Sequence, residues 1–444
     1  MGKRRRRKKL PEGLFQASIQ SLSHEGRGIA TINGKTTFIE NALPGETVEF
    51  SYTSTRSKFD QGVAEKIINA SEERVTPLCE FYGYCGGCSM QHMSPEAQLA
   101  HKQQVLLEQF EHLGQVSPEQ VLPPLTGPIS GYRHKARLAA KYVVKKEKTL
   151  VGFREKRSAF VADINACEVL HPEVGHKLTD LSQLIESLSN RDQIPQIEVA
   201  VSEENTALVF RHLTPFNETD IEQLKNFQSD YKFLIYLQPE GYDSVHRLDD
   251  DSDLSMQYHL PDFDLSLSFL PTDFTQINVE INRSMIKQAI QHLDLNENDQ
   301  VLDLFCGIGN FTLPMATIAK RVTGVEGDAG LIERAKLNAS NNNLNNVDFH
   351  VADLAADELI YPFMQQHYNK LLLDPARTGA KEIISALNLK EIDLIVYVSC
   401  NPATLARDAG ILVNEKSYRL THTGIMDMFP HTSHVESIAV FKRD

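Results

Sequence analysis

The chain has 444 residues, of which 41% are hydrophobic and 23% charged, with a formal net charge of −14. A chain of this length exceeds what one hydrophobic core organises, so two or three domains are expected. No apolar run reaches the roughly 18–20 residues that a membrane-spanning helix needs, and no apolar stretch follows the basic start as in a secretory signal. These features predict a cytoplasmic protein with no membrane partner.

Positive charge is concentrated at the N-terminus. Residues 3–9 are seven consecutive Lys or Arg, although the chain as a whole is acidic. Such a density favours contact with a polyanion, because nucleic-acid binding by cations releases counterions. The alternative interpretation is a solubilising tail. We expect residues 1–13 to be a basic disordered arm that contacts nucleic acid.

Residues 14–70 are predicted to form a small barrel of the oligonucleotide-binding type. Five short segments of alternating apolar and polar residues occur in 14–68, separated by turn signals such as Pro44-Gly45. Gly26, Gly28 and Gly34 fall at the bends, where a small barrel requires glycine.

Residues 75–265 read as a central domain of mixed α/β pattern, with a helical pattern at 95–113. Near its start, Cys79, Cys85 and Cys88 have the spacing C-x5-C-x2-C, and Cys167 follows 79 residues later. Four thiolates are a suitable ligand set for a [4Fe–4S] cluster or a zinc ion. Three clustered cysteines with one remote cysteine favour iron–sulfur, although spacing alone leaves zinc, or thiols without metal, open.

Residues 266–444 show the alternating pattern of a doubly wound parallel sheet. From residue 279 onward, helical and buried-strand patterns alternate, and the chain closes with a hairpin-like pair of strands. The fold expected for the whole chain is therefore multidomain: an N-terminal barrel, a central α/β domain with a metal cluster, and a C-terminal α/β Rossmann-like domain.

A candidate cofactor loop lies in this last domain. Gly307 and Gly309 follow a strand and precede a helix, where glycine permits close backbone approach and the helix offers free N–H groups. Glu326 ends the next strand, as suits a ribose diol, and Asp353 closes the third. The third glycine of a dinucleotide fingerprint is missing, because residue 312 is Thr. These features favour S-adenosylmethionine over a pyrophosphate-containing ligand.

Two further strands end in chemically active residues. Asp374 ends the fourth strand in "LLLDPARTG", and Cys400 ends the fifth in "YVSCNPATLARD", at the edge where open α/β sheets bind ligands. A thiolate that adds to C6 of uracil makes C5 nucleophilic, and a base must later remove the C5 proton. Glu436 is the candidate base. Cys400 alone would equally fit a buried core thiol, but a helix start after it is expected to favour the thiolate.

These motifs resemble those of the RNA uracil-5-methyltransferases, and most closely the bacterial branch that acts on 23S ribosomal RNA. The resemblance rests on "FIENALPGETVEF", "CEFYGYCGGCSMQH", "DFTQINVEIN", "LDLFCGIGNFTLPMA", "LLLDPARTG", "YVSCNPATLARD" and "FPHTSHVESIAVF". It implies that 14–70 is a TRAM domain, that Cys400 is the nucleophile and Glu436 the base, and that the cluster is [4Fe–4S]. The S-adenosylmethionine and uracil pockets would be lined by Gln276, Phe305, Asn310, Glu326, Asp353 and Asp374.

The resemblance also implies a 23S ribosomal RNA substrate, since its transfer-RNA branch lacks both barrel and cluster. Arg133 and Arg137, in "GYRHKARLAA", are candidates for phosphate contacts, with an ordinary amphipathic strand as the equal alternative. The expected function is S-adenosylmethionine-dependent methylation of C5 of a uridine in 23S ribosomal RNA, by a monomer. The alternatives are the same chemistry at another 23S uridine or in transfer RNA, or a non-catalytic iron–sulfur or zinc RNA-binding protein.

Overall fold

The computed structural model describes residues 10–249, 255–356 and 359–443. Most of the predicted basic arm, residues 1–9, lies outside these ranges. The described chain divides into two compact units: the residues up to 102 together with 430–434, and the residues 103–429 together with 435 onward. Among the described helices, none is both long and apolar enough to cross a membrane.

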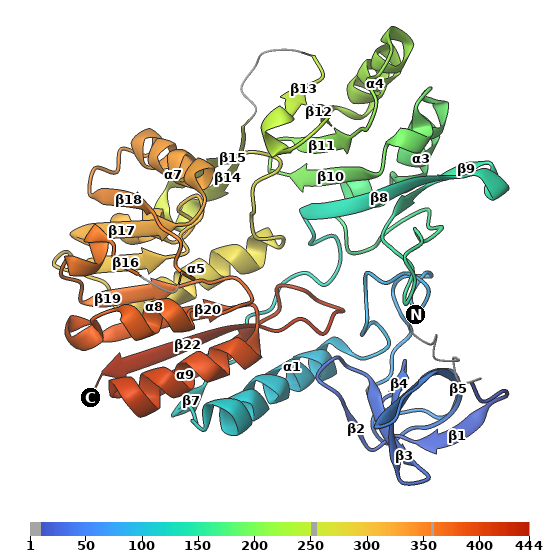
Figure 1. Cartoon of the computed structure of the whole chain (residues 1–444), viewed down its shortest axis with the longest axis horizontal. Coiled ribbons are helices and arrows are strands. Elements are labelled where there is room, and N and C mark those ends of the chain that lie inside the picture. Colours follow the sequence, from blue (N-terminus) through green and yellow to red (C-terminus); the bar gives the residue numbers. More distant parts are fainter. Residues whose placement is uncertain (1–9, 250–254, 357–358, 444) are drawn as a thin grey trace, which may run out of the picture. The chain divides into compact units, whose positions relative to one another are not determined.

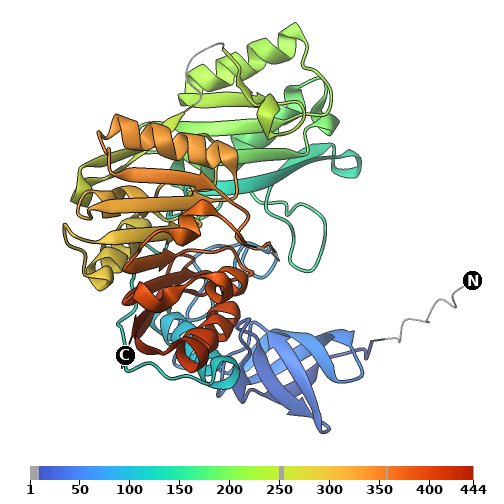
Figure 2. The ribbon, with the colours of Figure 1, turned by 60° about the vertical axis from the view of Figure 1, so that its left-hand side comes forward.

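The first unit contains a six-stranded barrel in the strand order β1-β5-β6-β4-β3-β2 (Figure 2). Its strands are β1 (Phe15–Ser18), β2 (Ser21–Leu22), β3 (Gly28–Ile32), β4 (Lys35–Glu40), β5 (Thr47–Thr55) and β6 (Phe59–Asn69). β1 pairs with β5 and β2 with β3, so one stretch of chain joins both edges of the sheet. Small and β-branched side chains with one Phe fill the interior: Ala17, Ile19, Ala30, Ile39, Ala42, Val48, Phe50 and Ala64. The barrel prediction is confirmed, with its first segment split in two.

An ion pair fixes the segment that leaves the barrel. The carboxylate of Glu46 is fully buried and accepts from Arg74 Nε at 2.5 Å and Nη2 at 2.8 Å, and from the Leu43 N–H at 2.8 Å. Loss of a donor to a buried carboxylate is strongly destabilising, so these bonds restrain both partners. The loop beginning at Arg74, which carries the three clustered cysteines, is therefore held at a defined position on the barrel.

The second unit begins within α1 (Pro95–Gln109) and contains two large sheets (Figure 1). The first is the central sheet, in the order β13-β12-β11-β10-β8-β9. Its strands are β8 (Lys135–Val143), β9 (Lys148–Gly152), β10 (Gln196–Val201), β11 (Thr206–Arg211), β12 (Phe233–Gln238) and β13 (His246–Arg247). The short α2 (Pro172–Gly175) precedes α3 (Leu178–Ser187), which packs on β9, and α4 (Glu218–Tyr231) packs on β12.

The second sheet has eight strands, in the order β18-β17-β16-β19-β20-β22-β21-β7. Its strands are β16 (Gln300–Leu304), β17 (Arg321–Glu326), β18 (Val347–Val351), β19 (Lys370–Leu373), β20 (Leu394–Ser399), β21 (Tyr418–Met426), β22 (Glu436–Arg443) and the short β7 (Gln120–Val121). β16 to β20 are mutually parallel, and β22 is antiparallel to β20. This arrangement confirms the Rossmann-like prediction for the C-terminal domain.

Helices cover both faces of this sheet, and Figure 1 shows α8 and α9 in front of it with α5 behind. The helices are α5 (Val279–Leu293), α6 (Thr312–Ala316), α7 (Ala329–Asn341), α8 (Lys381–Ala386) and α9 (Pro402–Lys416). A separate hairpin, β14 (Met256–Leu260) with β15 (Leu265–Phe269), contacts α7. Each long helix begins where the sequence supplies a cap: Asn278 accepts from the Ile281 N–H before α5, and Asn401 from the Ala403 N–H before α9.

Candidate active site

The residues predicted to act lie at one edge of the eight-stranded sheet. Glu326 is the last residue of β17, while Asp374 and Cys400 each directly follow their strands, β19 and β20. Because these strands are parallel, their carboxyl ends meet at the same edge. Glu436, the first residue of the antiparallel β22, lies at the same edge. Ser399 pairs with Ser437, so Cys400, which follows Ser399, comes opposite Glu436, which precedes Ser437.

The glycine loop after β16 has an unusual backbone. Phe305, Gly307 and Gly309 all have positive φ, at 67°, 55° and 95°. Left-handed φ is costly for a phenylalanine, so the surrounding bonds must impose it. The N–H groups of Phe305 and Cys306 both donate to Val325 O, and Gly307 N–H donates to the Glu326 carboxylate at 3.2 Å. The loop is thus fastened to β17, in a conformation suited to close approach by a ligand.

Three carboxyl groups lie close enough to influence one another beneath this loop. Burial raises the pKa of Asp303 to about 8, and the charges of Asp374 and Glu326 add to the shift, against a hydrogen bond from Thr312. Burial and Glu326 raise the pKa of Asp374 to about 7. In the described structure Asp303 Oδ1 is buried without a hydrogen-bond partner. Buried acceptors are normally satisfied, so this oxygen marks a position that a bound donor would complete. Asp303 was not among the predicted binding residues.

The predicted cofactor residues differ in how they are held. The Asn310 amide exchanges hydrogen bonds with Asn282, at 2.9 and 3.1 Å, and accepts from Tyr258 Oη at 2.8 Å. It therefore has a structural role in addition to any contact with a ligand. Asp353 is exposed beyond β18 and accepts from the Ala355 N–H at 3.0 Å, and Gln276 is half-buried. Their contacts with a cofactor remain predictions.

The loop that carries Gln276 is tied to the central sheet. Lys135 on β8 is half-buried, and its Nζ donates to the carbonyls of Pro271, at 2.7 Å, and Asp273. The Asp273 carboxylate in turn pairs with Arg334 of α7. Burial lowers the pKa of Lys135 to about 8 against the raising charges of Asp273 and Glu198. This interaction sets where the loop enters the catalytic domain.

The environment of Cys400 contradicts one expectation from the sequence. Its thiol pKa is raised to about 11, first by burial and then by the carboxylates of Glu436 and Asp374, with Arg377 opposing the shift. The start of α9 after Cys400 was expected to favour the thiolate, but burial of the thiol, together with two nearby carboxylates, outweighs that effect. Cys400 is therefore a neutral thiol at neutral pH in this state. Cys306, by contrast, is 4% exposed and packs in the core.

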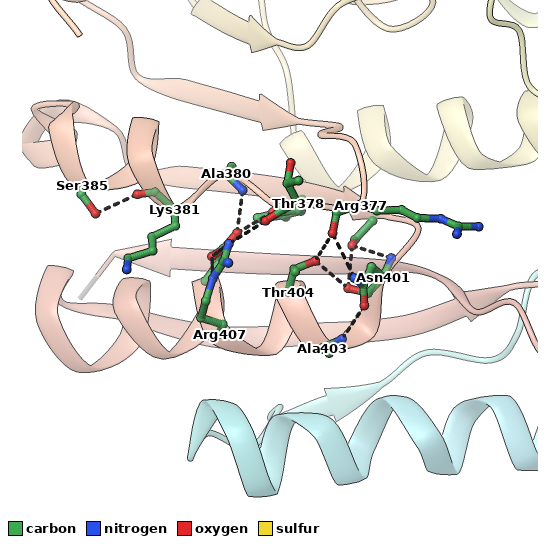
Figure 3. A network of polar contacts seen from close by, with 12 residues as sticks. Arg377, Thr378, Ala380, Lys381, Ser385, Asn401, Ala403, Thr404 and Arg407 are labelled. Atoms are coloured by element: carbon green, nitrogen blue, oxygen red, sulfur yellow. Dashed lines mark hydrogen bonds and ion pairs between the residues drawn. The ribbon is translucent and has the colours of Figure 1, made fainter. Parts of the chain in front are cut away.

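Side chains of α9 hold the loop that follows Asp374 (Figure 3). The Arg377 carbonyl accepts from Asn401 Nδ2 at 2.9 Å and from Thr404 Oγ1 at 3.2 Å. One turn further along the helix, Arg407 Nη2 donates to the Thr378 carbonyl at 3.0 Å. Asn401, Thr404 and Arg407, at positions spaced along one face of α9, were not predicted from the sequence to act together.

Asp408 completes this attachment. Its fully buried carboxylate accepts from the Ala380 N–H at 2.7 Å, from Tyr397 Oη at 2.8 Å and from Arg407 Nε at 2.8 Å. Gly379, with φ of 80°, lies against this pair, and a Cβ there would come within 2.6 Å of both Arg407 and Asp408. The loop after β19 is therefore anchored to α9, the helix that follows Cys400.

The clustered cysteines lie on a loop of the first unit. Tyr82 Oη donates to the Ser89 carbonyl at 2.7 Å, Cys79 N–H donates to Gln91 Oε1 at 2.9 Å, and Gly87 N–H lies 3.4 Å from Cys85 Sγ. Cys167 is buried in the second unit. Within the described ranges, no group of three or more His, Cys, Asp or Glu side chains is arranged to hold a metal ion.

The candidate phosphate contacts have protein partners in this structure. Arg137 forms hydrogen bonds to Glu198 at 2.9 Å and to Tyr242 Oη at 2.7 Å, and Arg133 lies over the Phe153 ring at 5.6 Å. Phosphate binding by Arg137 would compete with Glu198, so the amphipathic-strand alternative stays open for it.

Comparison with known proteins identifies the family. The model described as tRNA (Uracil-5-)-methyltransferase matches residues 96–444, and the TRAM domain model matches residues 15–59. The 23S rRNA (uracil(1939)-C(5))-methyltransferase RlmD of Francisella tularensis subsp. novicida is 50% identical over 100% of both chains. The protein of the same name from Alcanivorax borkumensis is 52% identical over 99% of both.

A solved structure agrees with these sequences. The Pyrococcus abyssi tRNA (uracil-54, C5)-methyltransferase in complex with S-adenosyl-L-homocysteine superposes with a TM-score of 0.73, covering 96% of this chain and all of that chain. At 23% identity this similarity establishes the shared fold. Together with the family match over residues 96–444, it shows that the chain belongs to the tRNA (uracil-5-)-methyltransferase family, the RNA uracil-C5 methyltransferases that its motifs resemble.

Proposed function

We propose that this protein transfers a methyl group from S-adenosylmethionine to C5 of a uridine in 23S ribosomal RNA, the position numbered 1939 in the names of its relatives. The observation that carries the proposal is full-length identity near 50% to those relatives, combined with the convergence of Cys400, Glu436 and Asp374. We further propose that it acts as a monomer in the cytoplasm.

The reaction begins at the Cys400 thiol. After the thiol passes its proton to water, sulfur bonds to C6 of the uracil, and the electrons of the C5–C6 double bond move onto the C4 carbonyl as an enolate. The two carboxylates that raise the thiol pKa oppose this step. Asp374 is one of the residues that would hold the methyl donor, and a positive sulfonium near it would offset carboxylate charge and favour the thiolate.

Methyl transfer and release follow. C5 attacks the methyl carbon, the S–CH3 bond breaks, and S-adenosylhomocysteine forms as a neutral thioether. Glu436 then takes the C5 proton, the C5–C6 double bond re-forms, and the bond between C6 and sulfur breaks to regenerate the thiolate. Glu436 is 8% exposed and lies beside Cys400, so it suits a base shielded from bulk water. The target uridine must leave its stacked position to reach this edge.

Gln276, Phe305, Asn310, Glu326, Asp353 and Asp374 are the residues that we propose to line the pockets of cofactor and base. The left-handed loop at 305–309 supports this assignment, as does the unpartnered Asp303 oxygen beneath it. Asp303 is an addition to the predicted set.

We also propose that Cys79, Cys85, Cys88 and Cys167 hold a [4Fe–4S] cluster. The support is chemical: four thiols are soft donors suited to iron–sulfur or zinc, and the Gly87 N–H beside Cys85 Sγ would stabilise a thiolate ligand. The cluster would fix the loop at 79–88, and no step of methyl transfer passes through it. Stoichiometric iron and sulfide in anaerobically purified protein, lost in Cys85→Ser, are expected. Zinc in their place would contradict the assignment.

Two variants test the catalytic assignment in vitro. Cys400→Ala should abolish methylation of a 23S fragment while RNA binding persists, because only the nucleophile is lost. Glu436→Gln should accumulate a denaturation-resistant protein–RNA adduct, because elimination stalls before proton removal. Glu382→Gln, an exposed acid on α8, is the matched control and should behave as wild type. Turnover by Cys400→Ala would rule out the covalent route. Methylation of transfer RNA, and not of the 23S fragment, would contradict ribosomal RNA as the substrate and identify transfer RNA in its place.

A further inference from the structure

The segment that follows β9 displays an aromatic side chain to solvent. Phe160 is 74% exposed, although an apolar ring gains stability by burial. It lies at the end of a short hairpin, residues 153–162, on the central sheet of the second unit. This hairpin is outside the catalytic edge already described.

The exposure of Phe160 is imposed by a fixed backbone. Arg154 and Val161 form an antiparallel bridge, Glu155 N–H donates to Phe160 O, and Ala162 N–H donates to Phe153 O, both at 2.9 Å. At the turn, Arg154 Nη1 donates to the Ala159 carbonyl at 2.7 Å. The Phe160 N–H donates to Ser158 Oγ at 3.0 Å, and Arg157 takes a left-handed φ of 66°. The hairpin therefore holds the ring away from the protein.

The sequence around Phe160 is rich in positive charge. Residues 133–161 contain ten Lys or Arg and two Glu, in a chain whose net charge is −14. Within this segment Arg137 pairs with Glu198, and Lys146 and Lys148 pair with Asp163 at 2.7 and 2.8 Å. The hairpin itself contributes three cations and one anion, and Arg154 and Arg157 are exposed. A polyanion is the class of partner that this distribution complements.

The base of the hairpin lies beside the strand that leads to the cofactor loop. Phe153 is under the guanidinium of Arg133, and Arg133 precedes β8, whose first residue Lys135 holds the loop at 271–273. A ligand on the hairpin is thus linked through one short strand segment to the loop that carries Gln276.

We propose that this hairpin is a binding element for single-stranded RNA, in which a nucleobase stacks on Phe160 and flanking phosphates contact the cations of the hairpin. Single-strand binding sites combine these two features, an exposed aromatic face and interleaved positive charge. The inference rests on the proposed function, and it names the surface that grips the ribosomal RNA beyond the target uridine.

The test measures RNA affinity directly. Phe160→Ala should weaken binding of a 23S fragment containing the target, measured by fluorescence anisotropy, by about 5- to 100-fold, the range of one lost stacking contact. Phe160→Trp should bind at least as tightly as wild type. Arg157→Asn, which tolerates the left-handed backbone, should weaken binding and reduce its salt dependence. Leu213→Ala removes an exposed apolar side chain from the connection after β11 of the same sheet and serves as the control, with unchanged affinity.

Unchanged affinity of Phe160→Ala, in protein that binds S-adenosylmethionine normally, would overturn the inference. A larger loss in Phe160→Trp than in Phe160→Ala would also contradict stacking. A failure of this inference can be distinguished from a failure of the proposed function, because anisotropy measures RNA binding without catalytic turnover. Wild-type protein that binds the fragment through Phe160 without methylating it would refute the proposed reaction and leave the hairpin assignment standing.

Discussion

At the scale of single residues, the surroundings of Cys400 control its reactivity. Strand-end positions in the sequence nominated Asp374 and Cys400, and the motif "HTSHVESIAVF" nominated Glu436; Cys400 alone fitted a core thiol equally well. The sequence could not predict the raised thiol pKa, because the closeness of Glu436 depends on the pairing of β20 with β22. At neutral pH the raised pKa keeps the Cys400 thiol protonated in the free protein, which would protect the proposed nucleophile from adventitious alkylation and oxidation.

The raised pKa of the Cys400 thiol predicts that alkylation of Cys400 in the free protein depends steeply on pH. The pKa of about 11 implies a rate that rises about tenfold per pH unit between pH 7 and 10, because only the thiolate reacts. Glu436→Gln removes one cause of the raised pKa and should increase the rate at a given pH. Mass spectrometry of the Cys400 peptide after iodoacetamide treatment measures both effects, with Glu382→Gln as control. A rate independent of pH across this range would be inconsistent with the carboxylate environment.

The buried carboxyls predict a second pH effect, on cofactor binding. Asp303 and Asp374, with pKa values raised to about 8 and about 7, become charged as pH rises from 6 to 8.5. Their negative charge favours the positive sulfonium, so S-adenosylmethionine should bind more tightly at the higher pH. S-adenosylhomocysteine shares the amino-acid and adenosine parts but has a neutral sulfur, so its calorimetric Kd should change less. Identical pH profiles for the two ligands would argue against this electrostatic role.

At the scale of elements, the attachment of the loop after Asp374 to α9 could not be predicted from the sequence. The sequence predicted the parallel strands, α5, α7 and the start of α9 closely, since each has a clear apolar period and a cap or proline at its start. It missed β7, a two-residue strand with no pattern of its own, and the bonds from Asn401, Thr404, Arg407 and Asp408. Such bonds join residues about 25 positions apart and depend on how the helix packs.

Asp408→Asn is predicted to lower kcat by about 10- to 100-fold, because a shift of the Asp374 loop of even about 1 Å misplaces the reacting groups. Asp408 does not itself reach the substrate edge, so RNA and cofactor affinities should change little. Steady-state kinetics with both substrates gives the required separation of kcat from KM. Glu415→Gln, an exposed acid on the same helix, is the control. A variant that loses both cofactor affinity and thermal stability would indicate a general folding defect and would contradict a positioning role for Asp408.

At the scale of the whole molecule, the chain combines a TRAM domain with a methyltransferase domain of Rossmann-like fold. Motifs contiguous in sequence are divided between its two compact units: residues 430–434 belong to the unit of the barrel, and Glu436 belongs to the other. The predicted cysteine ligands are divided in the same way. Hydrophobic periodicity located the barrel and the Rossmann-like sheet, but it contains no information about which loop joins which compact unit.

The basic arm provides a prediction at this scale. Removing residues 1–9 deletes seven consecutive cations, so affinity for 23S fragments should fall, and its logarithm should decline less steeply with salt concentration. Binding measured between 50 and 300 mM salt tests both quantities. Methylation at saturating RNA should be retained, because the catalytic edge is intact. An unchanged salt slope would assign the arm to solubility.

The central claim is methylation of C5 of a 23S uridine through Cys400. The most direct measurement is mapping of 5-methyluridine in ribosomal and transfer RNA from cells that lack this protein, complemented with wild type or with Cys400→Ala. We predict that one 23S position, equivalent to uridine 1939 of the relatives, loses its methyl group, regains it with wild type and stays unmodified with the variant. Full methylation of that uridine in the deleted strain, or its restoration by Cys400→Ala, would contradict the claim.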